Sequence, residues 1–303
     1  MNENFLYDLL IDPLTGESLV FDNALQTLKG NLSGHSYRLI ESVPEIITGD
    51  NPDIARSDIH RIYNSYFNYH DHYQKDADNF DYSEMNIPEV TRSENNRLHQ
   101  SIIHEIPGDL SVVLDVGCGN GWISKELIPL GKKVISMDIS STNPVNAVRG
   151  VRHKNHAGLI ADAYNIPLME NSVDCIVASE ILEHVPDPGK FIANLIKLLR
   201  KEGKLIITTP YNEKIEYFLC VHCNRLTPKH AHLHSFNEVN IKMYIPQTGT
   251  EWTCKKLINK WLSRIRSHIL LNPLPFRIWK SIDNIFNRIF KNPVRLQIVI
   301  TKT

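Results

Sequence analysis

Short apolar runs recur along the second half of the chain, and each ends at Gly, Asp, Asn, Ser or Pro. Runs of about four to eight residues bounded by such turn formers predict buried strands. The predicted strands cover 112–116, 133–138, 158–163, 173–180, 204–210 and 294–301. Amphipathic stretches separate several of them, and this alternation predicts an α/β fold with a doubly wound, mostly parallel sheet.

Three glycines at alternate positions, Gly117, Gly119 and Gly121, follow directly after the first of these strands. Glycine adopts positive φ and has no Cβ, so such a loop turns tightly and lets a ligand lie against the main chain. A dinucleotide fingerprint needs a further glycine at position 122 for close packing of helix on strand, and Trp122 stands there. The loop therefore predicts a ligand site, and its spacing argues against NAD.

Aspartates stand at the ends of two later strands. Asp138 ends 133–138, where a doubly wound sheet binds ribose hydroxyls, because a carboxylate accepts two hydrogen bonds. Asp162 lies near the end of 158–163. A single strand-end Asp more commonly caps a helix or shapes a turn. The joint order of the glycines and both acids favours a binding site.

The pattern Asp115-x-Gly117-x-Gly119-x-Gly121 resembles motif I of the class I S-adenosylmethionine-dependent methyltransferases of the methyltransferase type 11 kind. Segments 158–163 and 173–187 are similar to later motifs of that family, in the family's order. The resemblance implies a Rossmann-like, seven-stranded, mostly parallel sheet with S-adenosylmethionine as cofactor. The implied cofactor-binding residues are Asp115, Gly117, Gly119, Gly121, Asp138, Ile139, Asp162, Ala163 and Ser179.

Methyl transfer is a direct displacement at a sulfonium carbon, so it needs alignment first and a base only where the acceptor holds its proton. His184, His232 and His234 are the first candidates for such a base. Capping or packing is the alternative for His184, and Glu180 and Glu183 are expected at surface helix positions. The acceptor is expected to be a small molecule or a lipid-linked compound, methylated at O or N.

The first 108 residues divide into two parts. Residues 1–50 resemble the small zinc-ribbon-like Trm112 module in a degenerate form, since the first cysteine of the chain is Cys118; the alternative is a short antiparallel sheet that shields the main domain. Residues 51–108 are expected to form a helical lid or linker. Its aromatic residues either line an acceptor pocket or pack between domains; they are Tyr63, Tyr66, Phe67, Tyr69 and Tyr73. The methyltransferase domain is expected over 109–303.

A possible zinc loop covers 220–236. Cys220 and Cys223 form a Cys-x-x-Cys pair, and His230, His232 and His234 follow. Two thiolates and two imidazoles satisfy tetrahedral zinc. The predicted ligands are Cys220, Cys223, His230 and His232, and an unmetallated loop is the alternative.

The net charge of −1 conceals an asymmetry. From Glu251 onward the chain has 11 Lys or Arg and two acids, so this part carries +9 and the remainder −10. At 100° per residue, 275–291 forms a helix with one apolar and one basic half. Such a helix either packs on the domain or lies on an anionic membrane surface, where it would meet a lipid-linked acceptor.

The composition bears on whether the protein spans a membrane, is secreted or is cytoplasmic. No run approaches the roughly 20 apolar residues of a membrane span, and the N-terminus lacks signal-peptide features. Five cysteines, an odd number, do not form a secreted disulfide framework. We expect a cytoplasmic enzyme, with peripheral contact at the inner membrane face if 275–291 binds lipid. An RNA methyltransferase and a noncatalytic cofactor-binding scaffold are the alternatives; nucleic acid is the less favoured partner, because the basic residues share their helix with a wide apolar face. The oligomeric state is left open.

Overall fold

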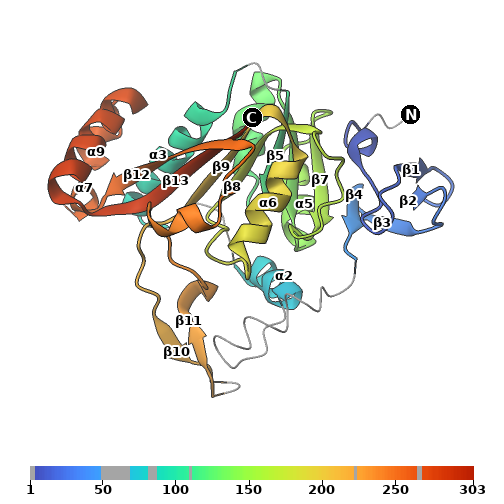
Figure 1. Ribbon diagram of the computed structural model, residues 1–303, viewed down its shortest axis with the longest axis horizontal. Coiled ribbons are helices and arrows are strands. Elements are labelled where there is room, and N and C mark those ends of the chain that lie inside the picture. Colours follow the sequence, from blue (N-terminus) through green and yellow to red (C-terminus); the bar gives the residue numbers. More distant parts are fainter. Residues whose placement is uncertain (1–3, 49–68, 81–86, 109–110, 222–223, 265–267) are drawn as a thin grey trace.

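The computed structural model describes residues 4–48, 69–80, 87–108, 111–221, 224–264 and 268–303 (Figure 1). In these residues eleven strands form one continuous sheet, in the order β1-β2-β3-β4-β7-β6-β5-β8-β9-β13-β12. A separate short hairpin joins β10 to β11. The strands are β1 Leu19–Asp22, β2 Thr27–Gly30, β3 Ser36–Ile40, β4 Val43–Ile46, β5 Val112–Val116, β6 Lys133–Asp138, β7 His156–Ala161, β8 Val173–Ser179, β9 Leu199–Pro210, β10 Tyr217–Leu219, β11 Leu226–Pro228, β12 Thr250–Asn259 and β13 Pro293–Lys302.

Helices lie over both faces of this sheet (Figure 1). The α-helices are α2 Tyr69–Asn79, α3 Glu89–Glu105, α4 Trp122–Leu127, α5 Thr142–Gly150, α6 Pro188–Leu198, α7 Lys260–Arg264, α8 His268–Leu271 and α9 Phe276–Phe290. The 3-10 helices are η1 Tyr7–Leu9, η3 Ile128–Leu130, η4 Lys229–Ala231 and η5 Asn240–Met243.

The seven strands from β7 to β12 form the predicted doubly wound sheet. Strands β7, β6, β5, β8 and β9 pair in parallel, and β13 runs antiparallel to both β9 and β12. Strand β5 is buried at every position because helices cover both of its faces, and this explains its unbroken apolar run. Its side chains divide by alternation: Leu114 belongs to the core on the α6 face, and Val113 to the core under α3 and α4. The predicted seven-stranded α/β fold is confirmed.

The N-terminal strands do not form a separate sheet. Strand β4 pairs in parallel with β7 through Glu45 and Ile160, so β1 to β4 extend the sheet edge, and Leu6 and Leu10 belong to the core of the main domain. The buried carboxylate of Asp12 organises this region. It accepts hydrogen bonds from the backbone N–H of Leu14 and from the side chains of Ser33, His35 and Tyr37. The likeness to a Trm112 module stays a prediction.

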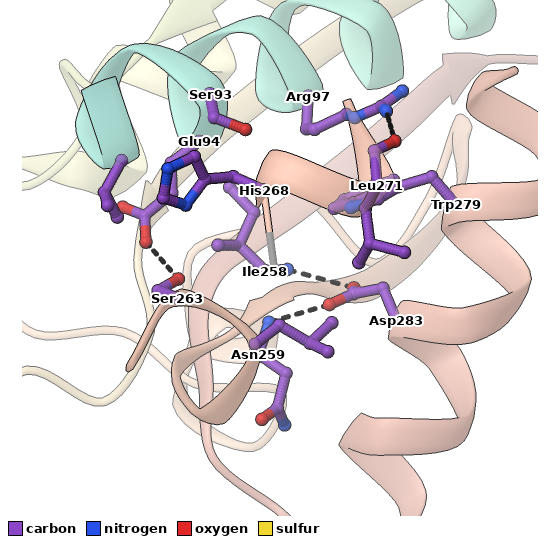
Figure 2. A pocket seen from close by; sticks show the side chains of 12 residues that line it. Ser93, Glu94, Arg97, Ile258, Asn259, Ser263, His268, Leu271, Trp279 and Asp283 are labelled. Carbon is purple, nitrogen blue, oxygen red and sulfur yellow. Dashed lines mark hydrogen bonds between the residues drawn. The ribbon is translucent and has the colours of Figure 1, made fainter. Parts of the chain in front are cut away.

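The C-terminal helices are fastened to α3 and to the end of β12 (Figure 2). Arg97 of α3 donates to three main-chain carbonyls at and after the end of α8, those of Leu271, Asn272 and Leu274. Its guanidinium lies 5.2 Å from the ring centre of Trp279. Asp283 of α9 accepts from the backbone N–H of Ile258 at 3.0 Å and of Asn259 at 2.7 Å. The cavity between these elements holds about 30 Å³, room for one or two water molecules. It lies apart from the carboxyl ends of the parallel strands, because none of its lining residues follows β5, β6, β7 or β8.

No helix within the described ranges has the length and apolarity needed to cross a bilayer.

The contact between α9 and β12 predicts a stability effect. Asp283→Ala leaves two buried N–H groups without an acceptor, so we expect it to lower the free energy of unfolding by about 2–4 kcal/mol in urea titration. Asp283→Asn keeps one acceptor oxygen and should lose less. Ser281→Ala, on the exposed face of the same helix, should change stability by less than about 0.5 kcal/mol. A loss for Asp283→Ala as small as that of Ser281→Ala would contradict this account.

Candidate active site

The glycine loop after β5 has one position that is open to a ligand. Gly117, Gly119 and Gly121 have φ of 71°, 47° and 67°, in the left-handed region that favours glycine. A Cβ on Gly117 would lie 2.2 Å from the Ile181 side chain, and one on Gly121 would lie 2.8 Å from Ala147. A Cβ on Gly119 would meet nothing within 4 Å. Gly117 and Gly121 therefore allow the loop to pack, and Gly119 leaves its main chain accessible.

Two carboxylates flank this loop. Asp138 at the end of β6 accepts from the Ser140 backbone N–H at 2.9 Å and from the Asn143 amide at 3.0 Å. Asp115 is 2% exposed, and its Oδ2 has no hydrogen-bond partner among the described residues. Burial, and then the charge of Asp138, raise the pKa of Asp115 to about 8. Burial therefore favours the neutral form of Asp115 in the empty site, and its Oδ2 keeps hydrogen-bonding capacity for a ligand that carries donors or positive charge.

The other predicted cofactor residues lie at the same sheet edge, because the carboxyl ends of parallel strands meet there. Ile139 is half-buried directly after β6. Asp162 and the buried Ala163 follow β7, and Asp162 accepts from the Tyr164 backbone N–H at 2.9 Å. Ser179 ends β8 with its hydroxyl 3.0 Å from that of Thr208. The structure brings all these residues to one edge, and their roles stay predictions.

Helix α2 bridges two loops at this edge. Gln74 accepts from the Ser141 backbone N–H at 2.8 Å, and Asp78 accepts from the Thr142 hydroxyl at 2.5 Å, beside the loop after β6. The ring of Tyr73 meets that of His184, after β8, edge-on at 6.0 Å. This placement supports a lid role for part of 51–108. Tyr63, Tyr66 and Phe67 lie outside the described residues.

Helix α3, by contrast, is not part of a lid. Its Ile102 is fully buried, and its Ser101 hydroxyl donates to Gln297 of β13 at 2.6 Å. The expected lid therefore does not extend over the whole of 51–108, because the apolar face of α3 packs on the sheet.

A second polar cluster follows β8. Glu183 is 1% exposed, and its Oε2 has no hydrogen-bond partner among the described residues. Glu180 is half-buried, with Oε2 2.8 Å from Nε of Arg295. The expectation that both occupy surface helix positions is wrong. Residues 182–184 form a turn before α6 begins, and Glu183 within it is buried.

The three candidate bases differ in their surroundings. Burial, and then the neighbouring His232, lower the pKa of His184 to about 3, so this imidazole is neutral and a weak base. His232 Nδ1 lies 2.5 Å from Oε2 of Glu213, and the rings of His184 and His232 are 4.8 Å apart. His234 Nε2 lies 3.3 Å from the carbonyl oxygen of Pro186, an arrangement that favours a structural role.

The described residues do not assemble the predicted zinc set. Cys220 lies at the tip of the β10–β11 hairpin, where its N–H donates to the Arg225 carbonyl, and Cys223 lies outside the described residues. His230 is exposed, with its ring 5.8 Å from that of His232. His232 instead joins Glu183 and His184 in the group of described side chains whose ligand atoms lie close enough for a metal ion. Sequence spacing missed Glu183 because nothing local marks it as buried.

Comparisons with known proteins agree with this geometry. Residues 114–207 match the family model described as a methyltransferase domain. The chain is 33% identical over 132 residues to a ubiquinone biosynthesis O-methyltransferase of Xanthomonas axonopodis pv. citri. The aligned region covers 40% of this chain and 53% of the relative. A protein of the same name from Pasteurella multocida is 28% identical over 192 residues, and the aligned region covers 51% of this chain and 78% of that protein. The chain thus spans about half the length of the first of these relatives.

The fold comparison points the same way. A solved S-adenosylmethionine-dependent methyltransferase of Archaeoglobus fulgidus superimposes with a TM-score of 0.50 at 15% identity, covering 69% of this chain and 94% of that structure. The chain carries a class I methyltransferase domain. The family model extends from within β5 to within β9 and so includes the glycine loop.

S-adenosylmethionine fits the residues of this methyltransferase domain. The unpartnered Oδ2 of Asp115 and the carboxylate of Asp138 are acceptors for an ammonium group and for hydroxyls. The main chain at Gly119 has the clearance that a bound ligand requires. When bound, the cofactor supplies a methyl group on a positively charged sulfur, and the two carboxylates favour that charge.

The clearance at Gly119 predicts a selective loss of cofactor binding. Gly119→Val places a branched side chain in the ligand's space, so calorimetry should detect no binding of S-adenosylhomocysteine. Gly131→Val is the matched control, because Gly131 also has positive φ, 79°, and open space at its Cβ but lies outside the site. It should bind like the wild type. Equal binding by Gly119→Val and the wild type would reject this placement of the cofactor.

Proposed function

We propose that this chain transfers a methyl group from S-adenosylmethionine to a hydroxyl oxygen of a small-molecule acceptor. The observation that carries the proposal is the open main chain at Gly119 between the carboxylates of Asp115 and Asp138. Both curated relatives are named O-methyltransferases, and this favours oxygen over nitrogen as the methylated atom.

The acceptor side is the loop after β8. Ile181 contacts the glycine loop, so this segment lies directly beside the cofactor site. Glu183, His184 and His232 face one another there, and Tyr73 of α2 covers His184. A half-buried site of this kind holds the acceptor in one orientation.

Alignment is the main task of these residues, because the sulfonium already activates the methyl group. A neutral His184 can hold an acceptor hydroxyl by accepting its hydrogen bond. Its lowered pKa disfavours full proton transfer to this ring, so His184 acts here as a positioning group.

Turnover tests the proposal. Radiolabelled S-adenosylmethionine should methylate a probe phenol such as 3,4-dihydroxybenzoate. Asp138→Ala should weaken cofactor binding by about 1–3 kcal/mol through loss of charge-assisted contacts, and the effect should fall on KM for the cofactor. Glu251→Ala, an exposed acid on β12, should leave KM unchanged. A wild-type chain that binds cofactor but methylates no member of a phenol, catechol and amine panel would favour the noncatalytic alternative.

We also infer that α9 contacts an anionic lipid surface, which would present a lipid-linked acceptor. The helix packs on the domain through the buried Trp279 and Asp283. Three of its isoleucines form a largely exposed strip: Ile278 (51%), Ile285 (52%) and Ile289 (65%). At 100° per residue these three positions fall within about 40° of one another.

Basic residues border this strip. Arg277, Arg288 and Lys291 are exposed beside it, in the part of the chain that carries +9. Apolar insertion combined with about 1 kcal/mol per basic residue near anionic headgroups supports peripheral binding. This arrangement favours a lipid surface over RNA, because an isoleucine strip offers no stacking platform for bases.

Vesicle co-sedimentation tests the α9 strip. The chain should pellet with vesicles of phosphatidylglycerol and phosphatidylcholine, not with pure phosphatidylcholine, and salt should weaken the binding. Ile285→Glu with Ile289→Glu should abolish it, and Arg288→Glu with Lys291→Glu should weaken it. Leu32→Glu is the control, since Leu32 is 91% exposed in the turn between β2 and β3. A wild type that stays in the supernatant at low salt would refute lipid contact.

A further inference from the structure

We infer that Glu183, His184 and His232 bind a divalent transition-metal ion at the acceptor side of the site. The inference deepens the proposed function, and the role given to the metal in catalysis rests on it. Metal binding itself can be tested without turnover.

The ligand geometry is the first argument. Glu183, His184 and His232 each offer one ligand atom, and the three atoms lie within 4.8 Å of one another. His184 follows Glu183 in the loop after β8, and His232 comes from the loop after η4. The N–H groups of Leu233 and His234 both donate to the main-chain carbonyl of Glu183, at 2.7 Å and 3.2 Å. Two loops distant in sequence are therefore tied together at the cluster.

The hydrogen bonds of the two rings are the second argument. His232 Nδ1 donates to the Glu213 carboxylate at 2.5 Å, and His184 Nδ1 lies 3.4 Å from the carbonyl oxygen of Ala231. A histidine that binds a metal commonly donates its other ring N–H to a carboxylate or a main-chain carbonyl, which fixes the tautomer. Both rings show that arrangement, so Nε2 of each is the nitrogen available to a cation.

The charge balance is the third argument. Glu183 is 1% exposed with an unpartnered Oε2, and the neighbouring Glu180 already pairs with Arg295. A buried carboxylate without a counter-charge is costly, and a divalent cation would supply that charge.

The donor set selects the class of metal. Two imidazoles and one carboxylate suit Zn²⁺, Mn²⁺ or Fe²⁺ better than Mg²⁺ or Ca²⁺, which prefer oxygen ligands. Three protein ligands leave coordination positions open, and coordination there lowers the pKa of an acceptor hydroxyl. The acceptor O–H then loses its proton to solvent water. A lone pair of the oxygen forms the bond to the methyl carbon, and the electrons of the broken C–S bond remain on sulfur. With the ion bound, Nε2 of His184 coordinates it, and the ion holds the acceptor hydroxyl in place of this nitrogen.

Titration of the chelator-treated chain with Zn²⁺ and Mn²⁺ tests the site. Calorimetry should give about one ion per chain, and Glu183→Gln and His232→Gln should each weaken binding about tenfold or more. His230→Gln is the matched control, because this exposed histidine neighbours His232 without belonging to the cluster. Cys220→Ser should also bind normally. Loss of the ion in Cys220→Ser, with normal binding by Glu183→Gln, would overturn the assignment in favour of the cysteine loop.

Two further measurements keep the outcomes distinct. Co²⁺ added to the wild type should give visible absorption bands typical of nitrogen and oxygen ligands, without a thiolate charge-transfer band. This measurement uses the wild type alone, so it does not depend on the folding of any variant. S-adenosylhomocysteine binding should be unchanged in His232→Gln. A wild type that binds S-adenosylhomocysteine but none of these ions refutes the metal site alone, and one that binds an ion but no S-adenosylhomocysteine refutes the proposed function alone.

Discussion

The parallel pairing of β5 between β6 and β8 is the constraint on which the rest of the site depends. It brings the carboxyl ends of these strands to one edge, where Asp115 lies near the end of β5, Asp138 ends β6 and Glu180 follows β8. Both faces of β5 are buried, so a one-residue shift in register would move each side chain into the core on the opposite face, where its shape does not match its neighbours. The same burial that holds the strand in place also raises the pKa of Asp115.

The buried acids of this chain differ in whether the fold supplies hydrogen-bond partners for their carboxylates. Asp12 accepts hydrogen bonds from several neighbours in the N-terminal region, and Asp283 accepts from two main-chain N–H groups at the end of β12. These two are satisfied within the fold and serve its packing. Asp115 and Glu183 each retain an oxygen without a partner in the described part of the chain. Because such groups are costly, their presence at the sheet edge marks a place where ligands complete the structure.

The two halves of the site have different origins. The cofactor side is built from loops that directly follow strands, so its residues are near in sequence to the elements that position them. The acceptor side joins the loop after β8 to the loop after η4 through the carbonyl of Glu183. Helix α2 then bridges both sides, through Gln74 and Tyr73. Loop closure of this kind allows the acceptor side to vary while the cofactor side keeps its geometry.

The sequence alone determined the sheet and its ligand-binding edge, because strand order, apolar runs and glycine spacing are local properties. The strands 112–116, 133–138 and 173–180 match β5, β6 and β8 within about one residue, and α9 lies within the predicted 275–291. The local sequence did not decide which face of α9 packs on the domain. Asp283 is buried because it meets the end of β12, and Ile285 is exposed.

Only the tertiary structure decided the surroundings of the acids and histidines. Glu183 and His232 are 49 positions apart, and only the contact between their loops makes them neighbours. The N-terminal strands likewise joined the main sheet through β4 and β7, where sequence reasoning placed a separate module. Periodicity reports which side of an element is apolar, but long-range contacts decide which surface that side meets, and so which polar groups lose their water.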